Sequence, residues 1–247
     1  MPLIVALAAG FFAAALLYAS VGFGGGSTYA ALLAIAGMDY RVLPVVALAC
    51  NIVVVAGSSV RFAKNGLTPW RGALILTALA APAAFVGGLV PIEREAFFGV
   101  LGVSLLVTGA TLMLPIGSEG REPARLSRFV PLMAPPLGFL AGLVGIGGGI
   151  FLAPILHLVR WNSARAIAAT ASVFILVNSV FGLFGQMAKR GPQLLGGALT
   201  DALPLLLAVA IGGQIGGMMA ARILPPRWIR WITAALVEIV GARLLLG

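Results

Sequence analysis

Two glycine clusters are the part of this sequence best suited to chemistry. VGFGGG occupies residues 21–26 and VGIGGG occupies residues 144–149, each inside a long apolar segment. Glycine leaves the main chain uncovered, so that successive N–H groups can face a ligand. A helix that resumes after such a cluster adds the partial positive charge of its N-terminus. Each cluster therefore predicts a site for a small oxyanion in which main-chain donors replace charged side chains.

The candidate substrate-binding residues are the clustered glycines, the hydroxyl residues after the first cluster, and polar side chains of the segment that follows each cluster. They are Gly24, Gly25, Gly26, Ser27, Thr28, Asn51, Gly147, Gly148, Gly149, Thr170, Ser172 and Asn178. We expect helices to resume from about Ser27 and Ile150. Two alternatives stay open: glycines four residues apart also allow close helix packing in lipid, and polar side chains also join helices by hydrogen bonds.

Three charged residues are candidates for gating or coupling. Arg41 and Arg165 open corresponding segments, each just after a capping-type residue, Asp39 or Ser163. The two arginines could guard the two mouths of a pathway, or they could anchor the chain at the membrane surface. Glu238 lies inside the last apolar segment. Its carboxylate could carry a coupling proton, or it could be paired with an arginine near the interface.

The composition is that of an integral membrane protein. Hydrophobic residues make up 61% of the 247 residues and charged residues 9%, against about 25% charged residues in a soluble domain. Long apolar runs favour helices over a lipid-facing barrel, whose strands alternate. The net charge of +9 comes from basic residues in short connections, where they orient a membrane protein, so we expect no nucleic-acid partner. With one histidine and seven acids, the sequence predicts no metal site, no cofactor and no catalytic residues.

The apolar sequence divides into eight segments. They are about 3–37, 42–60, 72–90, 96–116, 129–159, 166–187, 194–221 and 228–246. The most polar connection, 117–128, lies at the midpoint of the chain. It predicts a first transmembrane repeat at 1–116, a linker at 117–128 and a second transmembrane repeat at 129–247.

The two halves share features in the same order. Besides the glycine clusters, these are Arg41 and Arg165, Lys64-Asn65-Gly66 and Lys189-Arg190-Gly191, Gly87-Gly88 and Gly216-Gly217, and Pro91 and Pro225. Internal repeats of this kind are common in transporters. We therefore expect each half to form one structural unit of four segments.

The first and fifth segments are too long for a single crossing, which needs about 20 residues. We expect each of them to enter the membrane, break at its glycine cluster and return. On that topology eleven basic residues lie on one side and five on the other, whereas eight simple crossings would leave no bias. The positive-inside rule then places the linker 117–128 in the cytoplasm and both termini outside.

Each half then makes three net crossings, so the second half is inserted upside down relative to the first. The predicted fold is an all-α integral membrane protein of two inverted-topology repeats, each with a glycine-broken re-entrant helix pair followed by three transmembrane helices. Two such hairpins would bring their glycine tips towards each other. Irregular main chain at that depth must be buried in protein or line a wet cavity.

The sequence resembles the TauE/SafE family of sulfite exporters. The resemblance is carried by the two glycine clusters, by ARAIAATAS at 164–172 and by the glycine-rich third segment of each half, and it would span nearly the whole chain. It implies a small multi-pass protein of the prokaryotic inner (plasma) membrane that transports small sulfur-containing anions, such as sulfite, thiosulfate or an organosulfonate. Export is the commonly inferred direction. Carry-over of the family's pattern assigns the glycine clusters, Thr170 and Ser172 to the anion pathway.

The first half departs from that pattern. When Arg41 is aligned with Arg165, Val46 and Leu48 fall opposite Thr170 and Ser172. The pocket is therefore expected to be asymmetric, with Asn51 supplying the polar contact of the first half.

We expect a secondary transporter that works by alternating access. The chain has no ATP-binding motif, so the energy would come from a coupling ion (a proton or sodium), from the substrate gradient or from a partner. The alternatives are an uncoupled anion channel and an uptake permease for a related oxyanion or carboxylate. The sequence leaves open the particular anion, the direction of flux, the coupling ion and the oligomeric state.

Overall fold

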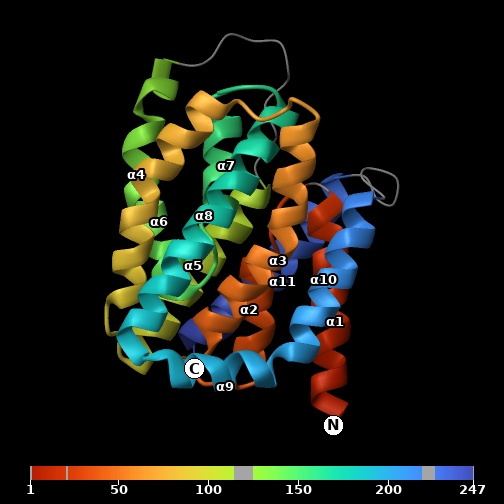
Figure 1. The fold of residues 1–247 in the computed structure, drawn as a ribbon, viewed down its shortest axis with the longest axis vertical. Helices are drawn as coiled ribbons and strands as arrows, with labels where there is room; N and C mark the ends of the chain where they lie inside the picture. The colour runs from red at the N-terminus through yellow and green to blue at the C-terminus, as the bar shows by residue number, and fades with distance from the viewer. Residues whose placement is uncertain (1, 21, 114–124, 219–225, 247) are drawn as a thin grey trace.

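The computed structural model describes residues 2–20, 22–113, 125–218 and 226–246 (Figure 1). Within these ranges the regular structure is entirely helical. Residues 117–124 of the predicted linker, residues 114–116 of the first predicted repeat and Val21 of the first glycine cluster lie outside the described residues.

The helices follow the eight predicted segments closely. The first half contains α1 (Pro2–Ser20), α2 (Gly26–Ile35), α3 (Leu43–Lys64), α4 (Trp70–Leu89) and α5 (Arg94–Met113). The second half contains a short 3-10 helix (Arg125–Phe129), α6 (Val130–Val144), α7 (Gly149–Leu158), α8 (Ala164–Arg190), α9 (Pro192–Asp201), α10 (Leu203–Met218) and α11 (Pro226–Leu246). The seventh segment was expected to form one helix. It forms two, α9 and α10, which meet at Ala202.

Six helices among the described residues are long and apolar enough to cross a membrane. They are Leu3–Ser20, Leu43–Lys64, Trp70–Leu89, Arg94–Met113, Ser127–Val144 and Ala164–Arg190. The set includes the first arm of each glycine-broken pair. It does not include α10, which has 16 residues, or α11, which carries four charged residues.

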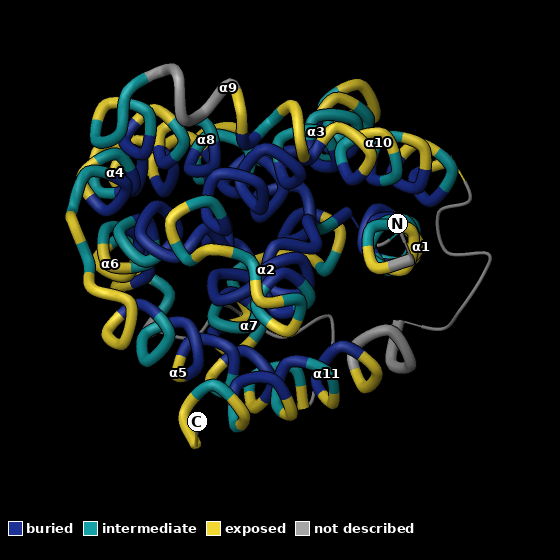
Figure 2. Tube along the Cα trace, turned by 90° about the horizontal axis from the view of Figure 1, so that it is seen from below, coloured by how far each residue is buried: buried dark blue, intermediate teal, exposed yellow. Residues whose placement is uncertain are grey.

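Helices from the two halves pack in matching pairs. Helix α1 packs on α10 and α6 packs on α4, while α3 packs on α8 and α5 packs on α11. Figure 2 shows α2 and α7 in the buried centre, with the other helices around them. The termini lie at one end of the molecule, where α9 runs across the bundle (Figure 1).

Glycines bring the main chains of two of these pairs into direct contact. A Cβ on Gly142 of α6 would overlap the Ala84 carbonyl of α4, and a Cβ on Gly216 of α10 would overlap the Leu16 carbonyl of α1. For the glycines of α6, close helix packing is therefore the right interpretation. Both pairs, each of which joins one helix of the first half to one of the second, therefore rely on glycine for close contact.

Helices α3 and α8 run antiparallel through the core. Ser59, near the end of α3, donates to Ser172, near the start of α8, at 3.2 Å. Leu48, near the start of α3, lies against Gly182, towards the end of α8. Each of these helices directly follows the glycine-broken pair of its half. The corresponding helices of the two halves therefore run in opposite directions.

Two basic side chains at the end of α8 form hydrogen bonds with the main chain next to α3 and α4. The Arg190 guanidinium donates to the Arg41 carbonyl, and Lys189 Nζ donates to the Val90 carbonyl at 3.1 Å. At the other end of α4, Gly72 lies against the ring of Trp161, just before α8. The start of α3 and the end of α8 therefore share one end of the molecule.

Candidate functional site

Both glycine clusters break a helix, as the sequence predicts. Helix α1 ends at Ser20 and α2 begins at Gly26, while α6 ends at Val144 and α7 begins at Gly149. The helices resume one residue earlier than expected in each half.

Positive backbone angles explain four of the glycines at the breaks. Gly22 has φ of 84°, and Gly145, Gly147 and Gly148 have φ of 82°, 83° and 74°. Residues with a Cβ are strained in this left-handed region, whereas glycine is not. The chain can therefore leave one helix and enter the next within a few residues.

The two breaks meet in the centre of the molecule. A Cβ on Gly26 would overlap the carbonyl of Ile146, so the start of α2 lies directly against the second break. The Asn51 amide of α3 joins them, because its Nδ2 donates to the Ile146 carbonyl at 3.3 Å. The Asn51 side chain also lies against Gly24 and Gly147.

The N-termini of α2 and α7 therefore converge beside Asn51. The first N–H groups of a helix have no acceptor within the helix, and they carry the positive end of the helix dipole. Gly26 and Gly149 are both buried. Two buried helix N-termini thus direct partial positive charge towards the same region.

Helix α8 supplies a different set of side chains to the same region. Ile175, which aligns with Asn51 when Arg41 is aligned with Arg165, lies against Gly24, Gly147 and Gly149. A Cβ on Gly147 would also lie 3.2 Å from the hydroxyl oxygen of Ser179. One half thus offers an amide where the other offers an isoleucine, so the surroundings of the clusters are asymmetric.

Several buried polar atoms of α2, α3 and α8 have no hydrogen-bond partner within the described part of the chain. They are Ser27 Oγ, Asn51 Oδ1, Ser179 Oγ and both amide atoms of Asn178. All four side chains are fully buried. Leaving such an atom unpaired costs about 1–3 kcal/mol, so these groups are suited to binding a polar solute.

Three of the predicted hydroxyl residues are instead paired within the protein. Thr28 Oγ1 lies 3.0 Å from the Tyr18 hydroxyl. Thr170 Oγ1 donates to the Ala166 carbonyl of its own helix at 2.9 Å, and Ser172 accepts from Ser59. For Ser172 the alternative interpretation, a hydrogen bond that joins two helices, describes the observed contact.

Several residues at the breaks were not among the predicted set, and Tyr29, Ile175 and Ser179 are three of them. Tyr29 is fully buried and its ring lies against Gly25, while Ile175 and Ser179 lie against Gly147. Ile175 could have been found from the sequence, since the alignment of the two halves places it opposite Asn51. Tyr29 directly follows the predicted Ser27 and Thr28, but only the structure shows that its ring turns back onto the glycines.

The charged candidates lie away from the glycine clusters. Arg41 precedes α3 and Arg165 lies in the first turn of α8, so the antiparallel helices place these exposed residues at opposite ends. Arg41 Nε donates to the Tyr40 hydroxyl at 3.2 Å, and this bond and the charge of Asp39 raise the pKa of Arg41. Glu238 lies against Gly109 of α5. No contact tests a gating or coupling role for any of the three.

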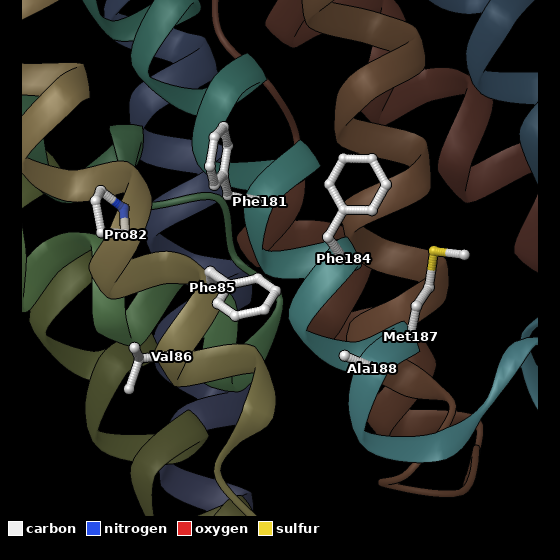
Figure 3. Close-up of a pocket in the computed structure, with 7 residues that line it drawn as sticks. All are labelled: Pro82, Phe85, Val86, Phe181, Phe184, Met187 and Ala188. Atoms are coloured by element: carbon white, nitrogen blue, oxygen red, sulfur yellow. The ribbon is translucent and has the colours of Figure 1, made fainter.

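A separate apolar groove lies on the outside of the bundle between α4 and α8 (Figure 3). It has a volume of about 920 Å³ and is lined by Pro82, Phe85, Val86, Phe181, Phe184, Met187 and Ala188. Its lining has no charged side chain, and Phe184 is 53% exposed. Such a surface suits lipid chains rather than an anion.

Broken helices that meet at the centre of a multi-span apolar bundle are typical of membrane transporters. The sequence pattern of the family described as sulfite exporter TauE/SafE matches residues 6–244, so the chain belongs to this family. It is 34% identical to the probable membrane transporter protein y4hK of Sinorhizobium fredii, over 98% of each chain. It is 25% identical to a probable membrane transporter protein of Methanocaldococcus jannaschii, over 91% of this chain and 89% of that one.

A third relative, the probable membrane transporter protein YunE of Bacillus subtilis, is 23% identical over 83% of this chain and 82% of its own. No solved structure matches the chain significantly. The family and these relatives are named as membrane transporters and not as enzymes. The protein is accordingly a multi-pass membrane transporter, with a small solute and the lipid bilayer as its partners.

Proposed function

We propose that the protein is a secondary transporter that exports a small sulfur-containing anion, such as sulfite or an organosulfonate. The observation that carries the proposal is the convergence of the α2 and α7 N-termini beside Asn51 in the buried centre. Main-chain N–H groups at two helix ends bind the oxyanion. The family description, which names sulfite export, suggests the substrate class.

Neutral donors suit a solute that must leave again. A lysine or arginine at this depth would keep a permanent charge away from water, which is costly in a membrane. The side chains found against the clusters are uncharged, and they include Asn51, Val55, Ile175, Ser179, Tyr29 and Phe174. The hydroxyls of Ser27 and Ser179 and the amide of Asn178 add donors that have no other described partner.

The burial of the clusters supports a carrier rather than a channel. Gly24, Gly25 and Gly26 are buried, as are Gly147, Gly148 and Gly149. An open channel keeps a continuous aqueous path to its selective site, whereas in this conformation the glycines are closed off from solvent. The anion therefore enters and leaves through rearrangements of the two halves that open the site to one side at a time.

The two halves act as inverted repeats around this site. The antiparallel packing of α3 on α8 and the matched pairs α1–α10 and α6–α4 support this arrangement. The positive-inside rule orients it, with the linker 117–128 in the cytoplasm and both termini outside. A proton or sodium gradient drives export.

Counterflow in proteoliposomes tests the proposal. Vesicles containing the purified protein are loaded with excess unlabelled sulfite, and a trace of radiolabelled sulfite is added outside. A carrier exchanges internal for external anion, so the label accumulates transiently above its equilibrium level. Thiosulfate, sulfoacetate, sulfate and acetate are then compared as the internal anion.

Two results would contradict the proposal. Label that equilibrates at the same rate with and without internal sulfite indicates an anion channel. Exchange that works with acetate but with no sulfur anion indicates a carboxylate permease.

A further inference from the structure

An arginine lies within a predicted membrane span at the end of α3. Arg61 is partly buried, and its Nη2 donates to Ser58 Oγ at 3.3 Å. No carboxylate among the described residues forms an ion pair with it. Arginines near the end of a span usually extend to the membrane surface, whereas the Arg61 head group lies back against Gly57 and Gly217.

Small residues on two helices make room for this guanidinium. A Cβ on Gly217 of α10 would overlap the head group of Arg61. On α3 itself, a Cβ on Gly57 would lie 3.4 Å from Arg61 Nη1 and 3.3 Å from Gln214 Nε2. The absence of a side chain at Gly57 and Gly217 thus leaves space for the head groups of Arg61 and Gln214. At these two positions glycine serves side-chain packing and not close contact between two main chains.

Other polar side chains lie beside Arg61 near the end of α3. Ser58 is bonded to Arg61, and the neighbouring Ser59 is bonded to Ser172 of α8. Asn51, which holds the two breaks together, precedes Arg61 by ten residues on the same helix, or about 15 Å along the helix axis. Residues 52–57, between Asn51 and this group, are apolar or glycine, so Arg61 and Ser58 lie at a polar position separate from the buried site.

We propose that Arg61, with Ser58 and Gln214, forms a second anion site that captures the transported oxyanion before it reaches the glycine clusters. The unpaired guanidinium attracts the anion and raises its local concentration. The site lies at the end of α3, on the side that the proposed orientation places in the cytoplasm. This inference rests on the proposed function, and it adds a full positive charge at the entrance to a central site whose donors are uncharged.

The test compares initial rates of sulfite transport in proteoliposomes, at sulfite concentrations that span half-saturation, for wild type, Arg61→Gln, Arg61→Lys and Gly217→Ala. Arg71→Gln is the control, because Arg71 is an exposed arginine in the first turn of α4, at the same end of the molecule. Arg61→Gln should raise the half-saturating concentration about tenfold, as expected for loss of a hydrogen bond to a charged group, with a maximal rate within about twofold of wild type. The half-saturating concentration of Arg61→Lys should lie between those of wild type and Arg61→Gln. Gly217→Ala, which displaces the guanidinium, should have the same half-saturating concentration as Arg61→Gln.

Salt gives a second readout. Raising the ionic strength should raise the half-saturating sulfite concentration of wild type and of Arg71→Gln. It should leave that of Arg61→Gln almost unchanged, because salt screens the attraction only where the Arg61 charge remains. Unchanged half-saturation in Arg61→Gln, or a loss of maximal rate alone, overturns the capture role while the proposed function stands. Absence of sulfite transport in wild type overturns the proposed function itself. If Arg61→Gln cannot be purified as folded protein, Arg61→Lys and Gly217→Ala decide the question.

Discussion

The contact between the two breaks can be disturbed by a single methyl group. In Gly26→Ala the new Cβ would overlap the Ile146 carbonyl and lie 2.5 Å from Asn51 Nδ2. Neither neighbour is the free end of a flexible chain, because one is main chain and the other is held by its bond to Ile146. The two breaks must therefore move apart, and the N-termini of α2 and α7 no longer meet.

The magnitude follows from three opposing effects. Alanine in place of glycine within a helix stabilises by up to about 1 kcal/mol. Overpacking costs about 1–3 kcal/mol, and loss of the Asn51 bond to Ile146 costs about 0.5–1.5 kcal/mol. We expect Gly26→Ala to be less stable by about 1–3 kcal/mol and to lose at least about 90% of its transport rate, since a tenfold change needs only about 1.4 kcal/mol.

Gly99→Ala is the matched control. Gly99 lies inside α5, and nothing lies within 4 Å of a Cβ built on it. The same chemical change should therefore leave the transport rate unchanged and the thermal unfolding temperature unchanged or raised. The measurements are counterflow in proteoliposomes and thermal unfolding in detergent. Equal transport by Gly26→Ala and Gly99→Ala would refute the claim that close contact between the two breaks is needed.

Three further substitutions address the rest of the site. Gly148→Leu should abolish transport while the protein still reaches the membrane, because Gly148 has φ of 74° and Leu137, Ala141 and Phe174 crowd its Cβ position. Counterflow measures the transport and membrane fractionation measures the targeting. Normal flux would contradict this prediction. Asn51→Leu should lower the transport rate about tenfold, since it removes the amide that holds Ile146, and a rate equal to wild type would show that this bond is dispensable. Glu238→Gln should leave the pH profile of transport unchanged, because Glu238 lies against α5, and a flattened profile would instead assign it the coupling proton.

The helix boundaries and the breaks could be predicted from the sequence because they depend on local properties. The length of an apolar run and the conformational freedom of glycine both act within a few residues. The division of the seventh segment into α9 and α10 was not predicted. Its local signal is Pro204, the second residue of α10, since proline is favoured in the first turn of a helix.

The side chains that face the breaks were harder to predict because helix rotation decides them. Thr170 and Ile175 are five residues apart on α8, which corresponds to a rotation of about 140°. Ile175 lies against three of the glycines, whereas the Thr170 hydroxyl is bonded to its own helix. Polarity singled out Thr170 and not Ile175, because the sequence alone does not fix which face of α8 turns towards the breaks.

Anomalous diffraction from crystals grown with selenite tests the central claim most directly. Selenite has the shape and charge of sulfite, and selenium can be located from its anomalous signal. We predict a peak within hydrogen-bond distance of the main-chain N–H groups at the start of α2 and α7, beside Asn51. A peak only at other positions, such as the groove between α4 and α8 or the exposed arginines at either end, would contradict the assignment of the glycine breaks as the anion site.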